Sequence, residues 1–385
     1  MNRDKNFMSI ALDLARLGLG RTSPNPAVGA VLVKNGKIIG RGFHKKAGMP
    51  HAEIEAIGNV RANLVFAQTT GRSQGSPLQD ATLYVTLEPC CHYGRTPPCT
   101  EAILKSGIRN VVIGMKDPDL QVSGKGIQIL RKNGIRVRVG ILEKECHALN
   151  LSYIKHRTTG LPFVILKIAS TLDGKVAMQS GESRWITGSE AREFGHRLRD
   201  RSDAILIGIQ TVLKDNPQLT SRGKNSQKDP LRIVLDSQLM IPFSAKILKV
   251  RKAPSTGLGQ VPTCVVTTVK PTHPKVSRLE KMGTEIIFCH KNKKGQVDLK
   301  DLLKQLGRRS IVNLLVEGGP TVASSFVREK LVDHLFLFLA PSFLGEKGIS
   351  MFSDLNIASL RQKIILKKTQ FRKIGEDILI EASFR

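Results

Sequence analysis

Two successive runs of alternating strands and helices constrain the fold of this chain more than any other feature. In the first run, Asn35-Gly36 separates two short apolar stretches, 28–33 and 37–42. Asn-Gly between such stretches is the strongest short-range sign of a β-hairpin. Further strands are predicted over 82–87, 110–115 and 136–139, and helices from about residue 51, over 98–106 and over 125–132. This alternation predicts a sheet covered by helices.

The pattern lapses between residues 142 and 162, where a polar, basic helix and a Thr-Gly-Leu-Pro turn precede a new strand over 163–169. We therefore expect a first domain over 1–145, a linker over 146–161 and a second domain over 162–385. A length of 385 residues exceeds the usual size of one hydrophobic core and agrees with two domains. Residues 61–80, rich in Gln, Thr, Gly and Ser, are predicted to form a surface insertion.

Composition narrows the class of protein. No window approaches the run of about 18 apolar residues that a membrane helix needs, so a soluble protein without a membrane partner is expected. The six cysteines are sparse, and only Cys90, Cys91 and Cys99 lie close together. Such clustering favours a metal site over a disulfide framework and suggests the reducing cytoplasm.

The formal charge of +28 is extreme and is compatible with nucleic acid, with anionic small substrates or with a generally basic proteome. Lys and Arg are spread through both halves, and aromatic residues, which would stack on single strands, are 5% of the chain. The composition therefore disfavours nucleic acid as a partner and leaves a small anionic substrate open.

The most informative motif is His51-Ala52-Glu53 followed by Glu88-Pro89-Cys90 and then Cys99. One imidazole and two thiolates bind Zn²⁺ well and leave a fourth position for water, which distinguishes a catalytic zinc site from a structural one. Zinc bound in this way lowers the pKa of its water towards 7, so that hydroxide is available at neutral pH. Glu53 is then placed to carry a proton from that water to a leaving ammonia, as a general acid and base and not a ligand.

This set of residues resembles the zinc signature of the cytidine-deaminase superfamily, with a longer gap than usual between the two cysteines. The gap sequence Pro89-Cys-Cys-His-Tyr-Gly-Arg-Thr-Pro-Pro-Cys99, with the stretch 22–30 and Lys116-Asp117-Pro118, resembles the bifunctional deaminase/reductase of riboflavin biosynthesis. The resemblance implies a cytidine-deaminase-like three-layer α/β/α domain with zinc on His51, Cys90 and Cys99. It implies hydrolysis of the exocyclic amine of a diaminopyrimidinone ribosylamine phosphate to a uracil.

The same resemblance implies a substrate pocket in the first domain, formed by Asn25, His44, His92, Arg95 and Asp117. His92 and Arg95 suit a dianionic phosphate, which needs fixed donors and positive charge. Asp119 stands where the family usually has Asn, and its extra carboxylate is expected to weaken substrate binding; it is not carried over as a site residue. Cys91 stands where a small residue such as Ser is common and is expected to have a supporting or core role.

The second half carries its own motif, a strand predicted over 311–316 that ends in Glu317-Gly318-Gly319-Pro320. A glycine pair after a strand lets the backbone approach a phosphate, and the following helix offers its N–H groups to the anion. No Gly-x-Gly-x-x-Gly sequence of the Rossmann type is present, and a glycine pair before a helix is often only a tight turn.

With the motifs around 167–175, 183–187, 203–208 and 211–217, this half resembles the reductase half of the same family. The resemblance implies a dihydrofolate-reductase-like α/β domain that takes hydride from NADPH and reduces a ribosyl group to ribityl. Implied NADPH contacts are Ala169, Trp185, Thr211, Asp215, Ser237, Gly319, Pro320, Thr321, Val322, Ala323, Ser324 and Ser325. Implied substrate contacts are Ser183, Arg199, Leu219, Arg222 and Glu317.

Lys167 and Glu317 are the candidates for polarising or protonating the carbon that receives hydride, because both lie at ends of predicted strands. Two alternatives stay open: a base deaminase that acts on tRNA or single-stranded nucleic acid, and a deaminase whose reductase-like half is inactive. A homo-oligomer is expected by resemblance.

Overall fold

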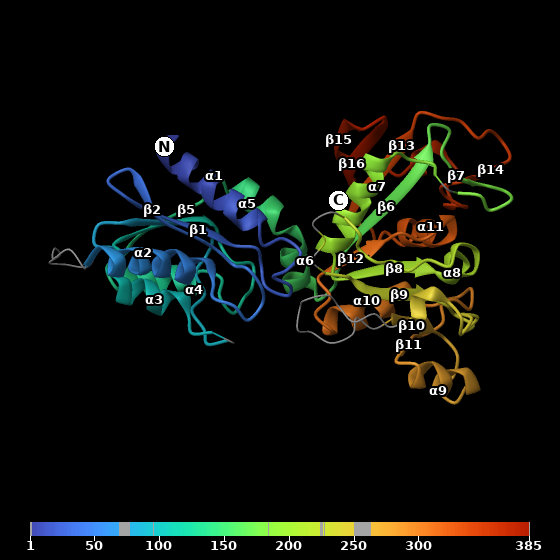
Figure 1. Cartoon of the computed structure of the whole chain (residues 1–385), viewed down its shortest axis with the longest axis horizontal. Helices are drawn as coiled ribbons and strands as arrows, with labels where there is room; N and C mark the ends of the chain where they lie inside the picture. Colours follow the sequence, from blue (N-terminus) through green and yellow to red (C-terminus); the bar gives the residue numbers. More distant parts are fainter. Residues whose placement is uncertain are drawn as a thin grey trace. The chain divides into compact units, whose positions relative to one another are not determined.

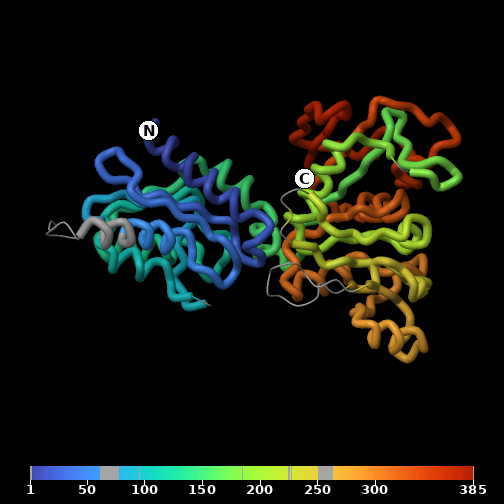
Figure 2. The backbone as a smooth tube through the Cα atoms, viewed as in Figure 1, coloured from blue at the N-terminus to red at the C-terminus, as the bar shows by residue number. Residues whose placement is uncertain are grey.

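The computed structural model describes residues 2–68, 78–94, 96–183, 185–223, 226, 228–249 and 263–384, without the side chains of 61–68. The chain folds as two compact units, Met1–Gly160 and Leu161–Arg385. Figure 1 labels their elements, and Figure 2 follows the course of the backbone.

The described part of the first unit contains a five-stranded mixed sheet with the order β2-β1-β3-β4-β5. β1 pairs antiparallel with β2 and β3, whereas β3, β4 and β5 are parallel. Asn35 and Gly36 both have positive φ angles, +52° and +72°, as a two-residue hairpin requires. The strands are β1 (Gly29–Lys34), β2 (Lys37–Phe43), β3 (Thr82–Leu87), β4 (Asn110–Met115) and β5 (Arg136–Val139), close to the predicted ranges.

Helices cover both faces of this sheet (Figure 1). One layer contains α1 (Asn2–Arg16) and α5 (Glu143–Leu149), and the other contains α2 (Ala52–Gln68), α3 (Cys99–Ser106) and α4 (Lys125–Lys132). Successive residues of β1 face opposite layers: Val31 packs in the cluster with α1, and Leu32 packs in the cluster with α2, α3 and α4. The three-layer arrangement is therefore built from strands that are buried on both sides.

The predicted linker over 146–161 is corrected by the structure, since residues up to Gly160 belong to the first unit. They form the end of α5 and the helix α6 (Leu151–Thr159). Cys146 and Tyr153 are buried against the α1 face of the sheet, and the Asn150 side chain bonds the backbone N–H and C=O of Ala27. The polar composition of the segment concealed the few side chains that attach it to the domain.

The predicted surface insertion over 61–80 is also partly corrected. Its first eight residues continue α2 as far as Gln68, and Leu78 is buried in the core below the sheet. Residues 69–77 lie outside the described part of the chain.

In the second unit the described residues form a nine-stranded sheet with the order β11-β10-β9-β8-β12-β6-β13-β16-β15. The strands from β11 to β13 are parallel, and β16 runs antiparallel to both of its neighbours. They are β6 (Phe163–Thr171), β8 (Ala204–Gly208), β9 (Leu231–Leu235), β10 (Thr263–Thr267), β11 (Glu285–Phe288), β12 (Asn313–Val316), β13 (His334–Ala340), β15 (Lys367–Ile374) and β16 (Asp377–Ser383). A small separate sheet pairs β7 (Lys175–Met178) with β14 (Gly348–Ser350).

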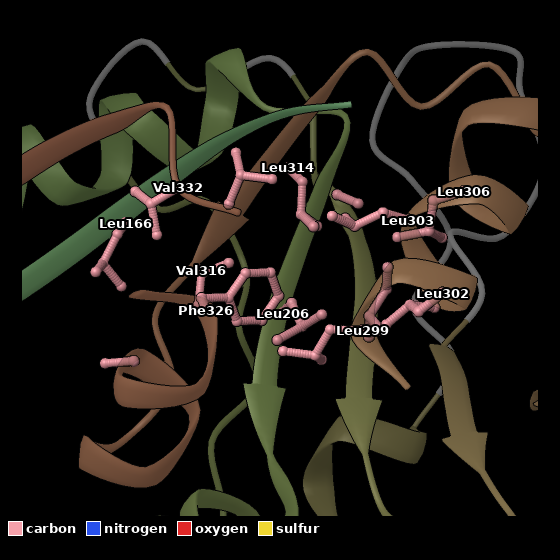
Figure 3. Close-up of a cluster of buried hydrophobic side chains, with 14 of the residues drawn as sticks. Leu166, Leu206, Leu299, Leu302, Leu303, Leu306, Leu314, Val316, Phe326 and Val332 are labelled. Atoms are coloured by element: carbon pink, nitrogen blue, oxygen red, sulfur yellow. The ribbon is translucent and has the colours of Figure 1, made fainter. Parts of the chain in front are cut away.

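The helices of this unit pack on the two faces of the large sheet. They are α7 (Ser189–Arg201), α8 (Ile209–Asp215), α9 (Pro274–Lys281), α10 (Leu299–Arg308) and α11 (Pro320–Arg328), with 3₁₀ turns at Lys246–Leu248 and Leu360–Gln362. The leucines of α10 at 299, 302, 303 and 306 form one buried face and meet Leu206 of β8 and Phe326 of α11 (Figure 3). Each such leucine stabilises the fold by about 1.5–3 kcal/mol.

None of the helices in the described ranges is long and apolar enough to cross a membrane.

Candidate active sites

Three possible metal ligands converge in the first unit. His51 immediately precedes α2, Cys90 lies in the loop after β3, and Cys99 is the first residue of α3. The His51 Nδ1 atom lies 3.6 Å from Cys90 Sγ and 3.3 Å from Cys99 Sγ, and the ligand atoms of all three residues lie within 4.8 Å of one another. The structure thus brings together the three residues that the sequence pattern selected.

The donor set fits a zinc ion. A tetrahedral ion with Zn–N of about 2.0 Å and Zn–S of about 2.3 Å separates its N and S ligands by about 3.6 Å. The backbone N–H of Cys99 donates to Cys90 Sγ at 3.3 Å, and the hydrogen bond from the Cys99 thiol lowers the pKa of Cys90. Cys90 is therefore favoured as the thiolate that a metal ligand must be. His51, Cys90 and Cys99 could hold zinc.

Glu53 lies in the first turn of α2, two residues beyond His51, and is buried with 3% exposure. Burial raises the pKa of Glu53 to about 7, and the neighbouring Cys90 adds to the shift. A carboxyl group whose pKa lies near neutrality can both accept and donate a proton.

His44 and Asn25 form a hydrogen-bonded pair beside His51. His44 follows β2, and its Nδ1 bonds the backbone carbonyl of Pro50 at 3.1 Å. Because that carbonyl is an acceptor, Nδ1 carries the proton and Nε2 accepts from Asn25 Nδ2 at 3.2 Å. Burial lowers the pKa of His44, so the ring is neutral at pH 7, and it meets the His51 ring edge-on at 5.1 Å.

Asp117 follows β4 and is tied to the helix α6. Its carboxylate accepts from the Tyr153 hydroxyl at 3.0 Å and from the backbone N–H of Asp119 at 2.9 Å. Burial raises the pKa of Asp117 to about 6. Arg157, one turn after Tyr153, forms an ion pair with Asp119 at 3.6 Å. Tyr153 and Arg157 of α6, in the segment predicted as a linker, thus hold the loop after β4 in place.

Glu88 has a structural role that its place in the motif did not reveal. Its carboxylate accepts from the backbone N–H groups of Asp117 at 3.2 Å, Gly124 at 2.9 Å and Ile127 at 3.2 Å. The side chain therefore joins the end of β3 to the loop after β4 and to the first turn of α4, where a negative charge is favoured.

These groups line a cavity of about 210 Å³. Of the predicted residues, it contains Asn25, His44, His51, Glu53, Cys90, His92 and Asp117, with Cys99 buried behind them. His92 is exposed at the rim, and Arg95 lies outside the described residues. The cavity also contains Met49, Thr96, Asp119, Tyr153 and Arg157, which had not been predicted as site residues.

The second unit contains a larger cavity, of about 950 Å³. It lies at the carboxyl ends of parallel strands, which is where open α/β sheets bind ligands. Predicted residues that line it are Lys167, Ala169, Ser183, Thr211, Asp215, Ser237, Glu317, Gly319, Pro320, Thr321, Val322 and Ser325.

Lys167 and Glu317 lie side by side in this cavity. Leu166 of β6 pairs with Val316 of β12, so the next residues on the two strands are neighbours. Arg199 donates from Nε and from a terminal nitrogen to the two Glu317 oxygens at 2.9 and 2.8 Å. Although burial opposes it, Arg199 lowers the pKa of Glu317 to about 2. Burial also lowers the pKa of Lys167.

The glycine pair packs tightly against the helix that follows. A Cβ atom at Gly318 would lie 2.6 Å from the Val322 side chain, so only glycine fits there. Gly319 is the N-cap of α11 with Pro320 in its first turn, and a Cβ atom at Gly319 would meet nothing closer than Thr211 Oγ1 at 3.9 Å. The free helix N–H groups and the open backbone fit a pyrophosphate of a dinucleotide such as NADPH.

Six predicted contacts do not line this cavity. Trp185 is exposed and lies against Arg192, Ala323 is buried in the hydrophobic core, and the buried Ser324 hydroxyl donates to the backbone carbonyl of Ser353. Leu219 packs in the hydrophobic cluster that contains residues of α7, α8 and α9, and Arg222 donates its backbone N–H to His196. Arg199 reaches the cavity only through Glu317. The cavity instead includes Asn292, Lys294 and Gln296, for which the sequence contained no motif.

Comparisons with known proteins cover both units. Residues 1–115 match the cytidine and deoxycytidylate deaminase zinc-binding region, and residues 162–380 match the RibD C-terminal domain. The riboflavin biosynthesis protein RibD of Aquifex aeolicus is 44% identical over 377 residues, which cover 98% of this chain and 97% of that protein.

Solved structures match the whole chain as well. Acinetobacter baumannii RibD has a TM-score of 0.84 at 37% identity and is covered to 99%, as is this chain. A Thermotoga maritima structure, described as a diaminohydroxyphosphoribosylaminopyrimidine deaminase/5-amino-6-(5-phosphoribosylamino)uracil reductase, has a TM-score of 0.82 at 36% identity, with 99% of both chains covered.

Fold and sites together define a zinc-dependent deaminase joined in one chain to a reductase. The chain belongs to the RibD family of riboflavin biosynthesis proteins. It is a bifunctional enzyme that uses zinc in its deaminase domain and NADPH in its reductase domain, and the predicted fold class is confirmed. A nucleic-acid base deaminase would not need the nicotinamide-site motifs of the second half, and that half matches the RibD C-terminal domain.

We predict that Cys99→Ser lowers the zinc content of the purified protein from one ion per chain to near zero, because a neutral hydroxyl is a poor ligand for zinc. The matched control is Cys91→Ser, which changes the same atom eight residues away, outside the three-donor group. Elemental analysis after dialysis measures both. Zinc lost equally from the two variants would contradict the assignment.

Proposed function

We propose that the first unit hydrolyses 2,5-diamino-6-(5-phosphoribosylamino)pyrimidin-4-one to the corresponding uracil, at the cavity that contains His51, Cys90, Cys99 and Glu53. We propose that the second unit then reduces the ribosyl group to ribityl at the cavity that contains Lys167 and Glu317. The product is 5-amino-6-(5-phosphoribitylamino)uracil.

The deamination replaces an exocyclic C–N bond by a C–O bond and releases ammonia. Zinc, when bound, supplies a water of lowered pKa. Glu53 accepts a proton from that water and delivers it to the leaving nitrogen, so its carboxyl group ends the cycle as it began. Neutral His44 and Asn25 orient the pyrimidine, and Asp117 accepts hydrogen bonds from it.

The observation that carries this assignment is the placement of Glu53. It is the carboxyl group two residues from His51, buried, with a pKa raised to about 7 by burial. A structural carboxylate at a helix start would instead be exposed or fully bonded to backbone N–H groups, as Glu88 is.

We predict that Glu53→Gln lowers kcat for ammonia release by about 10²–10⁴-fold, because the amide cannot transfer a proton. Zinc content and the NADPH-dependent reductase activity of the same protein should stay at wild-type levels. Ammonia release measured with and without added zinc tests this. A loss of less than about tenfold would show that another group carries the proton.

NADPH, when bound in this cavity, would supply the hydride for the first carbon of the opened ribose. With its pKa at about 2, Glu317 remains a carboxylate, and its negative charge attracts the cationic side chains of Lys167 and Arg199. Lys167, whose pKa is lowered by burial, donates the proton that the reduced group needs.

We predict that Lys167→Ala lowers the single-turnover rate of hydride transfer by about 10²-fold or more, with a smaller loss in Glu317→Gln. The exposed Lys304→Ala on α10 is the control and should match the wild type. Stopped-flow absorbance of NADPH reports the step. Unchanged hydride transfer in both site variants would remove Lys167 and Glu317 from the mechanism.

We also propose that the enzyme acts in the cytoplasm and as a homo-oligomer. All six cysteines are free, and the three-donor cluster needs reduced thiols.

Phe343, Ile365 and Phe371 expose large apolar side chains on the second unit, as oligomer contacts do. Light scattering should give a multiple of the 42.3 kDa chain mass; a monomer mass at micromolar concentration would contradict the oligomer.

A further inference from the structure

Helix α6 contributes two side chains to the deaminase cavity. Tyr153 and Arg157 are four residues apart, so they lie on the same face of the helix, and both line the cavity. The Arg157 guanidinium lies 5.6 Å from the centre of the Tyr153 ring. The helix is therefore part of the wall of the site.

The cavity wall is rich in carboxylates. Glu53, Glu88, Asp117 and Asp119 line it, and among the described lining residues Arg157 is the only lysine or arginine. The charge of Glu88 is held by three backbone N–H groups, and Asp117 accepts from the Tyr153 hydroxyl. Asp119 has its Oδ1 on the backbone N–H of Gln121 and its Oδ2 facing Arg157.

We propose that Arg157 is a positioning residue for the deaminase: it fixes the Asp119 carboxylate at the cavity wall and offsets its charge, so that a phosphorylated substrate is accepted. The proposal deepens the deaminase assignment and rests on it. A carboxylate left without a cation beside Asp117 would repel a phosphate dianion, because like charges brought together in a partly buried site cost free energy.

The contacts of Arg157 favour this role over direct binding of the substrate phosphate. Its Nε faces Asp119, and its guanidinium is packed beside the Tyr153 ring, whose hydroxyl is bonded to Asp117. These side chains thus contact one another as one group of four residues, Arg157, Tyr153, Asp117 and Asp119. Within it, Arg157 acts on the cavity through the Asp119 carboxylate.

A double-mutant cycle separates the two roles. Arg157→Gln should raise KM for deamination about tenfold with kcat within about twofold of wild type, since the chemical step is untouched. Asp119→Asn should change KM by less than about threefold. The double variant Asp119→Asn/Arg157→Gln should return to within about threefold of wild type, because removing the carboxylate removes the need for the cation.

Lys155→Gln, on the same helix but outside the cavity lining, is the matched control and should match wild type. Zinc content and the rate of NADPH oxidation with the deaminated substrate report folding of each domain in every variant. A tenfold rise in KM that persists in the double variant would assign Arg157 to the substrate itself and overturn the proposal. So would a KM unchanged by Arg157→Gln. Absence of ammonia release by the wild type would instead overturn the deaminase assignment.

Discussion

Parallel strand pairing is the constraint on which both sites depend. Because β3 and β4 are parallel, the loops that carry Cys90 and Asp117 leave the sheet at one edge. His51, just before α2, is added there with Glu53 and Cys99 from the first turns of α2 and α3. The same geometry puts Lys167, in the middle of β6, next to Glu317, which follows the last residue of β12. Each domain therefore assembles its chemistry from residues that are far apart in sequence.

Most of the architecture could be predicted from local patterns. The ranges of β3, β4, α4 and β5 agree with the structure to the residue, because β3 and β4 are short apolar runs that end before Glu88 and Lys116, and α4 lies between Gly124 and Asn133. The three-donor group of His51, Cys90 and Cys99, with Glu53 beside it, could be predicted because these residue types and their spacing are rare together. The resemblance to the riboflavin deaminase/reductase family then supplied the pocket residues that no local pattern contains.

What the sequence could not predict depends on contacts made across the fold. α6 looks like a polar linker, and only its packing on the sheet brings Tyr153 and Arg157 to the cavity. Ala323 and Ser324 were predicted as cofactor contacts from an unbroken run of residues, whereas α11 turns some of these side chains away from the cavity lining. The sequence indicated Glu88 only as part of the cysteine motif, whereas in the structure its carboxylate accepts three backbone hydrogen bonds and stabilises the loop after β4.

One chain thus carries two active sites, which we propose work in sequence on one small substrate. The most direct test follows ammonia release and NADPH oxidation by the purified, zinc-loaded protein with the diaminopyrimidinone ribosylamine phosphate. We expect ammonia release before NADPH is added, followed by NADPH oxidation in stoichiometric amount once it is present. Ammonia without NADPH oxidation, or neither signal, would contradict it.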